Sequence, residues 1–242
     1  MDTIRIPRST HTKLIAHRGL SGLECENTCA AFVAAGNRDY FGIETDIHPT
    51  ADGQYILIHD NNTGRVAVED LPVESSTLAA LRAVALKDTD GQPRGDLQTP
   101  LPEEYLRICR KYQKVGVLEF KGRFTKDQLA EVRGLVAEYY DESGLVNISF
   151  DYANLCDMRE LAPDAKIQYL CGDLTEEQLQ DMVARRIDVD AYSPTLNADK
   201  IAHMHELGLE VNCWTVDSPE DAQRLIQDGV DYITSNILQY AE

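Results

Sequence analysis

Acidic and basic side chains recur two residues apart in short apolar segments of this sequence. Glu44 and Asp46 are spaced in this way, as are Glu119 and Lys121. Side chains two apart on a strand share a face, so each pair points to the same side of its strand. Three carboxylates from neighbouring strands would be costly to bury unless they were paired or bound a metal. Oxygen ligands of this kind suit Ca²⁺ or Mg²⁺.

Two histidines stand where other strand candidates end. His17 and Arg18 end the first apolar segment, and His59 ends the short extended run 54–59. Imidazole transfers protons readily near neutral pH, which makes histidine a common acid or base. Each of these residues alone has an ordinary structural explanation, such as a helix cap, an ion pair or a surface turn. Because these residues are predicted together at matching ends of adjacent strands, their combination favours a catalytic site.

The elements that would position these residues form a regular alternation. Helical patterns separate eight apolar runs, which are Leu14–His17, Gly42–His48, Val115–Lys121, Leu145–Phe150, Ile167–Leu170, Val189–Ser193, Glu210–Thr215 and Asp231–Ser235. Alternating strands and helices indicate a parallel sheet, and eight such units in 242 residues predict a single (β/α)8 TIM barrel. An open doubly wound sheet is less favoured, because no GxGxxG pattern follows the first run. We expect residues 1–242 to form one domain.

Local signals support the helices, four of which are predicted at Thr125–Tyr140, Thr175–Arg186, Asn197–Leu207 and Pro219–Asp228. Thr175 with Gln178 predicts a capping box, and Ser218 precedes a helix-opening proline. The alternation is interrupted after the second strand. Asp52-Gly53 predicts a turn into a hairpin-like run, and the stretch from Asp60 to Thr99 predicts a small insertion with a short helix at Leu78–Leu86.

Composition limits the possible partners. The chain has 41 acidic and 23 basic residues, a net charge of −18. Such a chain repels nucleic acid and anionic membranes, so neither is expected as a partner. An anionic substrate would need positive charge supplied locally by the site.

Several features concern location and assembly. The segment Met1–Lys13 is polar and does not resemble a signal peptide, and no apolar run approaches the ~20 residues that span a bilayer. Six cysteines contain no CxxC pair and are expected to be reduced thiols. We expect a cytoplasmic protein without stable membrane insertion, present as a monomer or homodimer.

The ordered motifs resemble those of the glycerophosphodiester phosphodiesterase family. They are Ile15-Ala16-His17-Arg18-Gly19, Glu26-Asn27-Thr28, Glu44-Thr45-Asp46 with the following residues to Gly53, Ile58-His59-Asp60, Leu118-Glu119-Phe120-Lys121, Ser149-Phe150-Asp151, Trp214-Thr215-Val216 and Gly229–Thr234. The set covers nearly the whole chain. It implies a phospholipase-C-like (β/α)8 barrel that hydrolyses glycerophosphodiesters to sn-glycerol 3-phosphate and an alcohol.

The resemblance also implies roles for individual residues. His17 and His59 match the acid–base pair, with the two roles unassigned. The divalent metal ligands, for Ca²⁺ or Mg²⁺, match Glu44, Asp46 and Glu119. The substrate-binding positions match Arg18, Glu26, Asn27, Lys121 and Trp214, of which Glu26 and Asn27 belong to a loop that closes over the site.

Three positions depart from the family pattern. Cys25 replaces a usual proline, Ser235-Asn236 replaces a usual aspartate, and Gly64-Arg65-Val66 matches only loosely. None of these departures is expected to touch the metal or proton-transfer residues.

Two rival functions remain open on this scaffold. A lysophospholipase D would need an apolar approach for an acyl chain, and the 60–99 segment offers no strongly apolar lid. A non-catalytic module that binds a phosphate ligand is less favoured, because no proton-transfer or metal residue has been lost.

Overall fold

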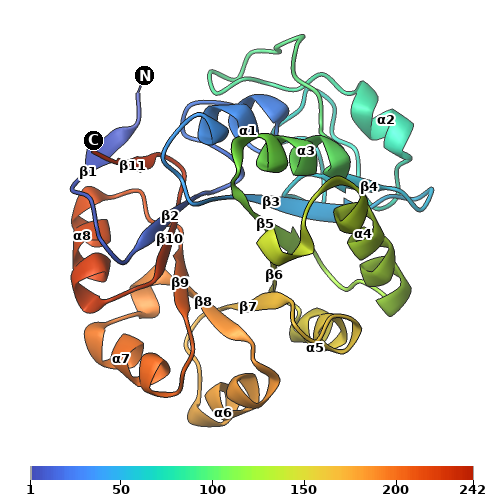
Figure 1. Ribbon diagram of the computed structural model, residues 1–242. Helices are drawn as coiled ribbons and strands as arrows, with labels where there is room; N and C mark the ends of the chain where they lie inside the picture. The colour runs from blue at the N-terminus through green and yellow to red at the C-terminus, as the bar shows by residue number, and fades with distance from the viewer. Residues whose placement is uncertain (1, 242) are drawn as a thin grey trace.

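The computed structural model describes residues 2–241 and contains a closed barrel of eight parallel strands (Figure 1). The barrel strands are β2 (Lys13–Ala16), β3 (Gly42–Pro49), β5 (Val115–Phe120), β6 (Leu145–Ser149), β7 (Lys166–Cys171), β8 (Asp188–Tyr192), β9 (Val211–Trp214) and β10 (Tyr232–Ser235). Pairing of β2 with both β10 and β3 closes the ring. The predicted barrel and its eight strand positions are confirmed, with ends shifted by no more than one residue.

Helices surround the barrel in the order expected from the sequence (Figure 1). Between the strands lie α1 (Cys29–Gly36), α3 (Pro102–Tyr112), α4 (Lys126–Tyr139), α5 (Tyr152–Leu161), α6 (Glu176–Arg185), α7 (Ala198–Glu206) and α8 (Pro219–Asp228), with short 3-10 turns at Glu142–Gly144 and Ser193–Thr195. The predicted capping box is present, since the Thr175 side chain accepts a hydrogen bond from the backbone of Gln178. Gly229 ends α8 with φ of 98°, a left-handed conformation that glycine adopts without strain.

No helix follows β10 in the described part of the chain. The place of an eighth helix is taken by two three-residue strands, β1 (Ile4–Ile6) and β11 (Leu238–Tyr240), which pair in parallel near α8. Ile6 and Leu238 are buried there and cover the apolar outer face of the barrel where a helix would otherwise lie. The sequence pattern did not predict this pair, because three-residue strands are too short to show a periodicity.

Packing positions the two strands that carry the predicted metal ligands. Tyr105 of α3 is fully buried, and its hydroxyl donates to the backbone oxygen of Ile43 on β3 at 2.7 Å. The same hydroxyl accepts from the backbone N–H of Val117 on β5 at 2.9 Å. One side chain therefore ties α3 to both strands. Inside the barrel, apolar side chains including Ile15, Val117 and Leu170 fill the space below the mouth.

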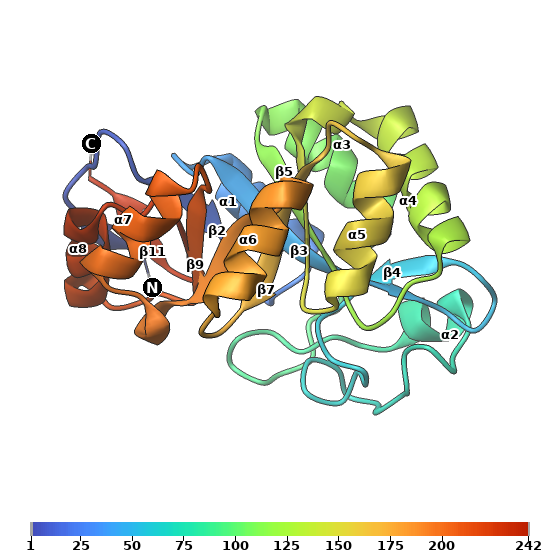
Figure 2. The same cartoon turned by 90° about the horizontal axis from the view of Figure 1, so that it is seen from below.

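The predicted insertion lies at the end of the barrel where the strands finish (Figure 2). Strand β4 (Tyr55–Leu57) pairs antiparallel with β3, which confirms the hairpin-like run, and α2 (Leu78–Ala83) is the short helix. Small apolar clusters anchor the segment, one of which contains Ile56, Val73 and Leu81. Within residues 2–241, no helix is long and apolar enough to cross a membrane.

Candidate functional site

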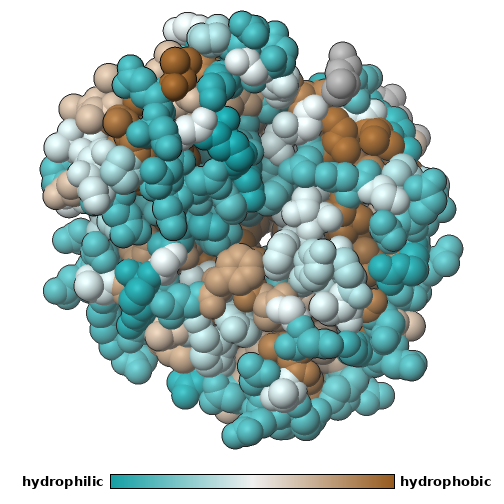
Figure 3. Space-filling model, turned by 180° about the vertical axis from the view of Figure 1, so that it is seen from behind, coloured by the Kyte–Doolittle hydropathy of each residue, from teal (hydrophilic) through white to brown (hydrophobic). Residues whose placement is uncertain are grey.

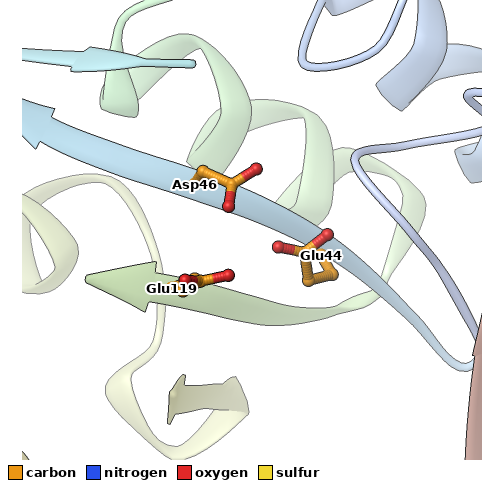
Figure 4. Close-up of side chains that lie close together, drawn as sticks. All are labelled: Glu44, Asp46 and Glu119. Atoms are coloured by element: carbon orange, nitrogen blue, oxygen red, sulfur yellow. The ribbon is translucent and has the colours of Figure 1, made fainter. Parts of the chain in front are cut away.

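The three predicted carboxylates meet at the carboxyl ends of β3 and β5 (Figure 4). Glu44 and Asp46 project from β3, and Glu119 lies opposite Asp46 in the register of β5. Each offers an oxygen atom, and these oxygens all lie within 4.8 Å of one another. All three side chains are buried, with 3%, 0% and 7% exposure. The spacing of two residues therefore placed both β3 carboxylates on the inner face, as expected.

Burial and crowding set the electrostatics of this triad. Burial, followed by the charges of its carboxylate neighbours, raises the pKa of Glu44 well above its ordinary value. Burial and then Asp46 raise the pKa of Glu119 to about 8. For Asp46, burial is outweighed by Lys121, Arg18 and His59, and the pKa is lowered.

The triad fits a divalent cation. Its donors are all hard oxygens, which Ca²⁺ and Mg²⁺ prefer. The Oδ1 atom of Asp46 is buried and makes no hydrogen bond within the described chain. A cation among Glu44, Asp46 and Glu119 would satisfy that oxygen and relieve the repulsion that raises the pKa of the two glutamates.

Two cationic side chains flank the carboxylates. Lys121 Nζ lies 2.8 Å from Glu119 Oε1 and 3.5 Å from Asp46 Oδ1. Arg18 Nε lies 3.6 Å from Asp46 Oδ2, and its backbone N–H donates to Glu44 Oε2 at 2.7 Å. Arg18 has φ of 54°, an uncommon conformation for a residue with a side chain, which turns the chain sharply after β2. The site thus places two cationic side chains beside three carboxylates, and a bound divalent cation would make the local charge positive.

His17 is held by an amide. Its Nδ1 lies 2.7 Å from Oδ1 of Asn236, while the Asn236 amide donates to Asp217 Oδ2 at 2.6 Å. Because a carboxylate oxygen only accepts, the Asn236 carbonyl must face His17, and His17 Nδ1 carries the proton. Burial and then Arg18 lower the pKa of His17 to about 4, so the ring is neutral near pH 7 with Nε2 free to accept.

His59 is held by a carboxylate. Its Nδ1 lies 2.6 Å from Asp60 Oδ1, and the other Asp60 oxygen accepts from Arg65 Nε at 2.6 Å. Burial lowers the pKa of His59 below its ordinary value, although Asp46 and Asp60 act in the opposite direction. The two histidines therefore differ in the chemical type of their partners.

The loop residues Glu26 and Asn27 bind protein atoms. The buried Asn27 amide donates to Asp46 Oδ2 at 2.8 Å and its carbonyl accepts from Thr45 at 2.6 Å. Glu26 Oε1 accepts from Arg18 Nη1 at 2.9 Å, and both Glu26 oxygens accept from Arg65. The loop thus supports a predicted metal ligand and a predicted phosphate-binding arginine.

Trp214 belongs to an aromatic rim at the barrel mouth. Its ring contacts Phe150 at 5.4 Å and Tyr192 at 5.3 Å between centroids. Phe150 and Tyr192 are 51% and 47% exposed, which is unusual for large apolar side chains. Figure 3 shows hydrophobic side chains beside a central hollow on an otherwise largely hydrophilic face. Lys121 Nζ lies 6.0 Å from the Phe150 centroid, which places the rim beside the cationic group.

One sequence-based expectation is wrong. The departures at Asn236 and Arg65 were expected not to touch the proton-transfer residues, yet Asn236 binds His17 and Arg65 binds the partner of His59. Asp60 was also not predicted as a functional residue, although its position directly after His59 could have indicated that it contacts this histidine. No local signal marks Asn236, because its contact spans 219 positions.

Comparison with known proteins identifies the family. The model of the glycerophosphoryl diester phosphodiesterase family matches residues 17–238. The chain belongs to this family. A glycerophosphodiester phosphodiesterase of Caldanaerobacter subterraneus is 28% identical over 229 residues, with 93% of this chain and 94% of the relative covered. The predicted resemblance and the enzyme class, a phosphoric diester hydrolase, are confirmed.

Solved structures share the barrel. A putative glycerophosphoryl diester phosphodiesterase from Silicibacter pomeroyi aligns with a TM-score of 0.84 at 25% identity, covering 96% of this chain and 92% of the other. A phosphodiesterase from Oleispira antarctica, solved in complex with sn-glycerol-3-phosphate, aligns with a TM-score of 0.86 at 20% identity and covers 93% of each chain. The second likeness concerns the fold alone.

Proposed function

We propose that this family member hydrolyses glycerophosphodiesters to sn-glycerol 3-phosphate and an alcohol, with a divalent cation held by Glu44, Asp46 and Glu119. The observation that carries the proposal is the buried carboxylate triad flanked by Arg18 and Lys121. When bound, the cation would supply positive charge to the phosphoryl oxygens as negative charge grows on them.

The two cationic side chains bind the phosphate in this proposal. Lys121 and Arg18 lie on either side of Asp46, with nitrogen atoms 3.5 and 3.6 Å from its oxygens. Preorganised charges stabilise a transition state strongly, because they need no reorganisation during the reaction. The partly buried position of both side chains limits screening by water.

In this proposal the two histidines take different roles, as their different partners suggest. The neutral His17, held by the Asn236 amide, accepts the proton of the glycerol 2-hydroxyl at Nε2. The freed oxygen attacks phosphorus, a five-membered cyclic phosphate forms, and the bond from phosphorus to the alcohol oxygen breaks. His59 donates its proton to that leaving oxygen in its imidazolium form, which the Asp46 and Asp60 carboxylates favour although burial lowers its pKa overall.

Hydrolysis of the cyclic phosphate reverses the two roles. The now neutral His59 removes a proton from water, whose oxygen attacks phosphorus. The ring bond to the 2-oxygen then breaks, and His17 returns its proton to that oxygen. Both histidines end in their starting protonation states, so the cycle balances.

A direct assay tests the proposal. The purified protein is incubated with glycerophosphocholine and Ca²⁺ or Mg²⁺, and release of sn-glycerol 3-phosphate is followed with ³¹P NMR, which also detects a cyclic phosphate. We expect release that stops when a chelator removes the metal. No release across several head groups, with and without metal, would contradict the proposal.

A lysophospholipase D activity is the second candidate, and the exposed rings of Phe150 and Tyr192 favour it. They offer an apolar approach at the barrel mouth, which the 60–99 segment was not expected to provide. Turnover of lysophosphatidylcholine against that of glycerophosphocholine decides between the two activities.

A cytoplasmic location also stays a prediction, supported by six cysteines that are all free thiols.

A further inference from the structure

Arg65, on the insertion, joins two carboxylates that lead into the site. Its Nε donates to Asp60 Oδ2 at 2.6 Å, and its Nη1 and Nη2 donate to the two oxygens of Glu26 at 2.6 and 2.8 Å. The contact with Glu26 is a two-point fork, a geometry that arginine forms and lysine does not.

Each carboxylate has a second partner in the reaction machinery. Asp60 Oδ1 binds His59 Nδ1 at 2.6 Å, and Glu26 Oε1 binds Arg18 Nη1 at 2.9 Å. A continuous series of charged hydrogen bonds thus runs from His59 through Asp60, Arg65 and Glu26 to Arg18. The series connects the proposed acid with the proposed phosphate-binding arginine.

The insertion holds the Arg65 backbone firmly. Lys87 donates from its backbone N–H to the oxygen of Val66 at 2.8 Å and from Nζ to the oxygen of Gly64 at 2.9 Å. Both neighbours of Arg65 are therefore attached to another part of the same segment. The Arg65 side chain can hold its partners in fixed positions only because its backbone is anchored, since a side chain on a mobile loop would not fix their geometry.

We propose that Arg65 is a positioning residue that orients His59 through Asp60 and leaves Arg18 available to phosphate by sharing the charge of Glu26. The proposal rests on the function proposed above, in which His59 protonates the leaving alcohol. It also gives the insertion a role, because Arg65 contacts both Asp60, the partner of His59, and Glu26, the partner of Arg18.

The physical consequence of losing Arg65 differs between the two carboxylates. Asp60 would keep only its contact with His59 and could turn, so the ring would lose its orientation toward the leaving oxygen. Glu26 would keep only Arg18 as a cationic partner and would compete with phosphate for it. Exposed ion pairs contribute little to stability, so the fold is expected to tolerate the change.

A leaving-group comparison tests the proposal in the full-length protein. Arg65→Met, Arg65→Lys and His59→Ala are assayed with glycerophosphocholine and with the 4-nitrophenyl ester of sn-glycerol 3-phosphate. Nitrophenolate is a weak base that leaves without needing a proton. We expect Arg65→Met to lower kcat for the choline ester at least tenfold and for the nitrophenyl ester less than threefold, with a smaller loss for Arg65→Lys. KM should rise by a similar factor for both esters, because Glu26 then competes with the phosphate for Arg18 in either case.

Arg94→Met is the matched control, because Arg94 also joins the insertion to the first loop, through Glu24 at 2.7 Å, and contacts no residue of the series. It should leave both rates within twofold. Equal losses of kcat for Arg65→Met on both esters, or no loss of kcat on either, would overturn the positioning role. If His59→Ala lowers kcat equally for both esters, His59 is not the acid that protonates the leaving alcohol. That result would refute the proposed function of His59, whereas a result confined to Arg65→Met would refute only the role of Arg65. Should Arg65→Met not fold, Arg65→Lys supplies the same comparison.

Discussion

Asn236 and His17 lie 219 positions apart and are joined by a hydrogen bond of 2.7 Å between Oδ1 and Nδ1. Asn236 is itself oriented by Asp217, which accepts from both its amide and its backbone N–H. The last turn after β10 therefore decides which nitrogen of His17 carries the proton. The first and last barrel strands pair directly, so the contact depends on closure of the barrel.

Replacing Asn236 by Leu should lower kcat roughly ten- to a hundredfold, a part of the ~10²–10⁴ that a general base contributes. Leucine has a similar size but cannot accept from His17, so the ring loses its fixed tautomer and orientation. Steady-state kinetics with glycerophosphocholine measures the effect. Ser21→Ala removes a hydroxyl that lies 2.7 Å from Asn236 Oδ1 and 2.8 Å from the backbone oxygen of His17 but leaves the His17–Asn236 bond in place, so it is the control and should cost much less. Equal rates for Asn236→Leu and the parent would refute the role.

His59→Ala should reduce kcat for glycerophosphocholine by about 10²–10⁴ with the fold intact. The reason is loss of the proton donor to an alkoxide that leaves poorly without one. His203→Ala is a suitable control, since His203 is 45% exposed and pairs only with Glu176 on a neighbouring helix. Circular dichroism and thermal unfolding establish folding. A variant that keeps more than a tenth of the parent rate would remove His59 from the proposed chemistry.

The fold and the triad were predictable from local patterns, whereas the partners of the histidines were not. Glu44 and Asp46 are two apart on one strand, so their common face follows from strand geometry alone. Glu119 joins them because adjacent parallel strands end together. Asn236 and Arg65 contact the histidines or their partners from loops that are distant in the sequence. The paths of these loops depend on barrel closure and on the packing of the insertion. No periodic pattern in the sequence predicts the paths of these loops.

Without metal, the stability of the protein should fall as the pH rises from about 4.5 to 8. Burial and Asp46 raise the pKa of Glu119 to about 8 in the folded state, above its ordinary value of 4.5. A raised folded pKa means that the folded state binds the extra proton, so its stabilising effect is complete below 4.5 and is lost as the pH passes 8. Thermal unfolding in chelator at several pH values measures this loss.

The same experiment with metal supplies the contrast. Ca²⁺ or Mg²⁺ at a hundred times its dissociation constant should add about 2.7 kcal/mol to the free energy of unfolding and remove most of the decline with pH. Glu119→Gln should be less sensitive to pH in chelator and gain little from metal. If added metal stabilised the parent and Glu119→Gln equally, the triad would not be the binding site.

The aromatic rim gives the last prediction, which concerns substrate choice. Phe150 and Tyr192 expose about half of their surface and both contact the Trp214 ring, and Lys121 Nζ lies 6.0 Å from the Phe150 centroid. A substrate whose phosphate contacts Lys121 would place its apolar part against these rings. Changing both Phe150 and Tyr192 to Ser should raise KM for lysophosphatidylcholine about tenfold, which corresponds to ~1.4 kcal/mol. KM for glycerophosphocholine, which has no acyl chain, should change less than threefold. Equal changes for both substrates would show that the rim contacts a part that they share.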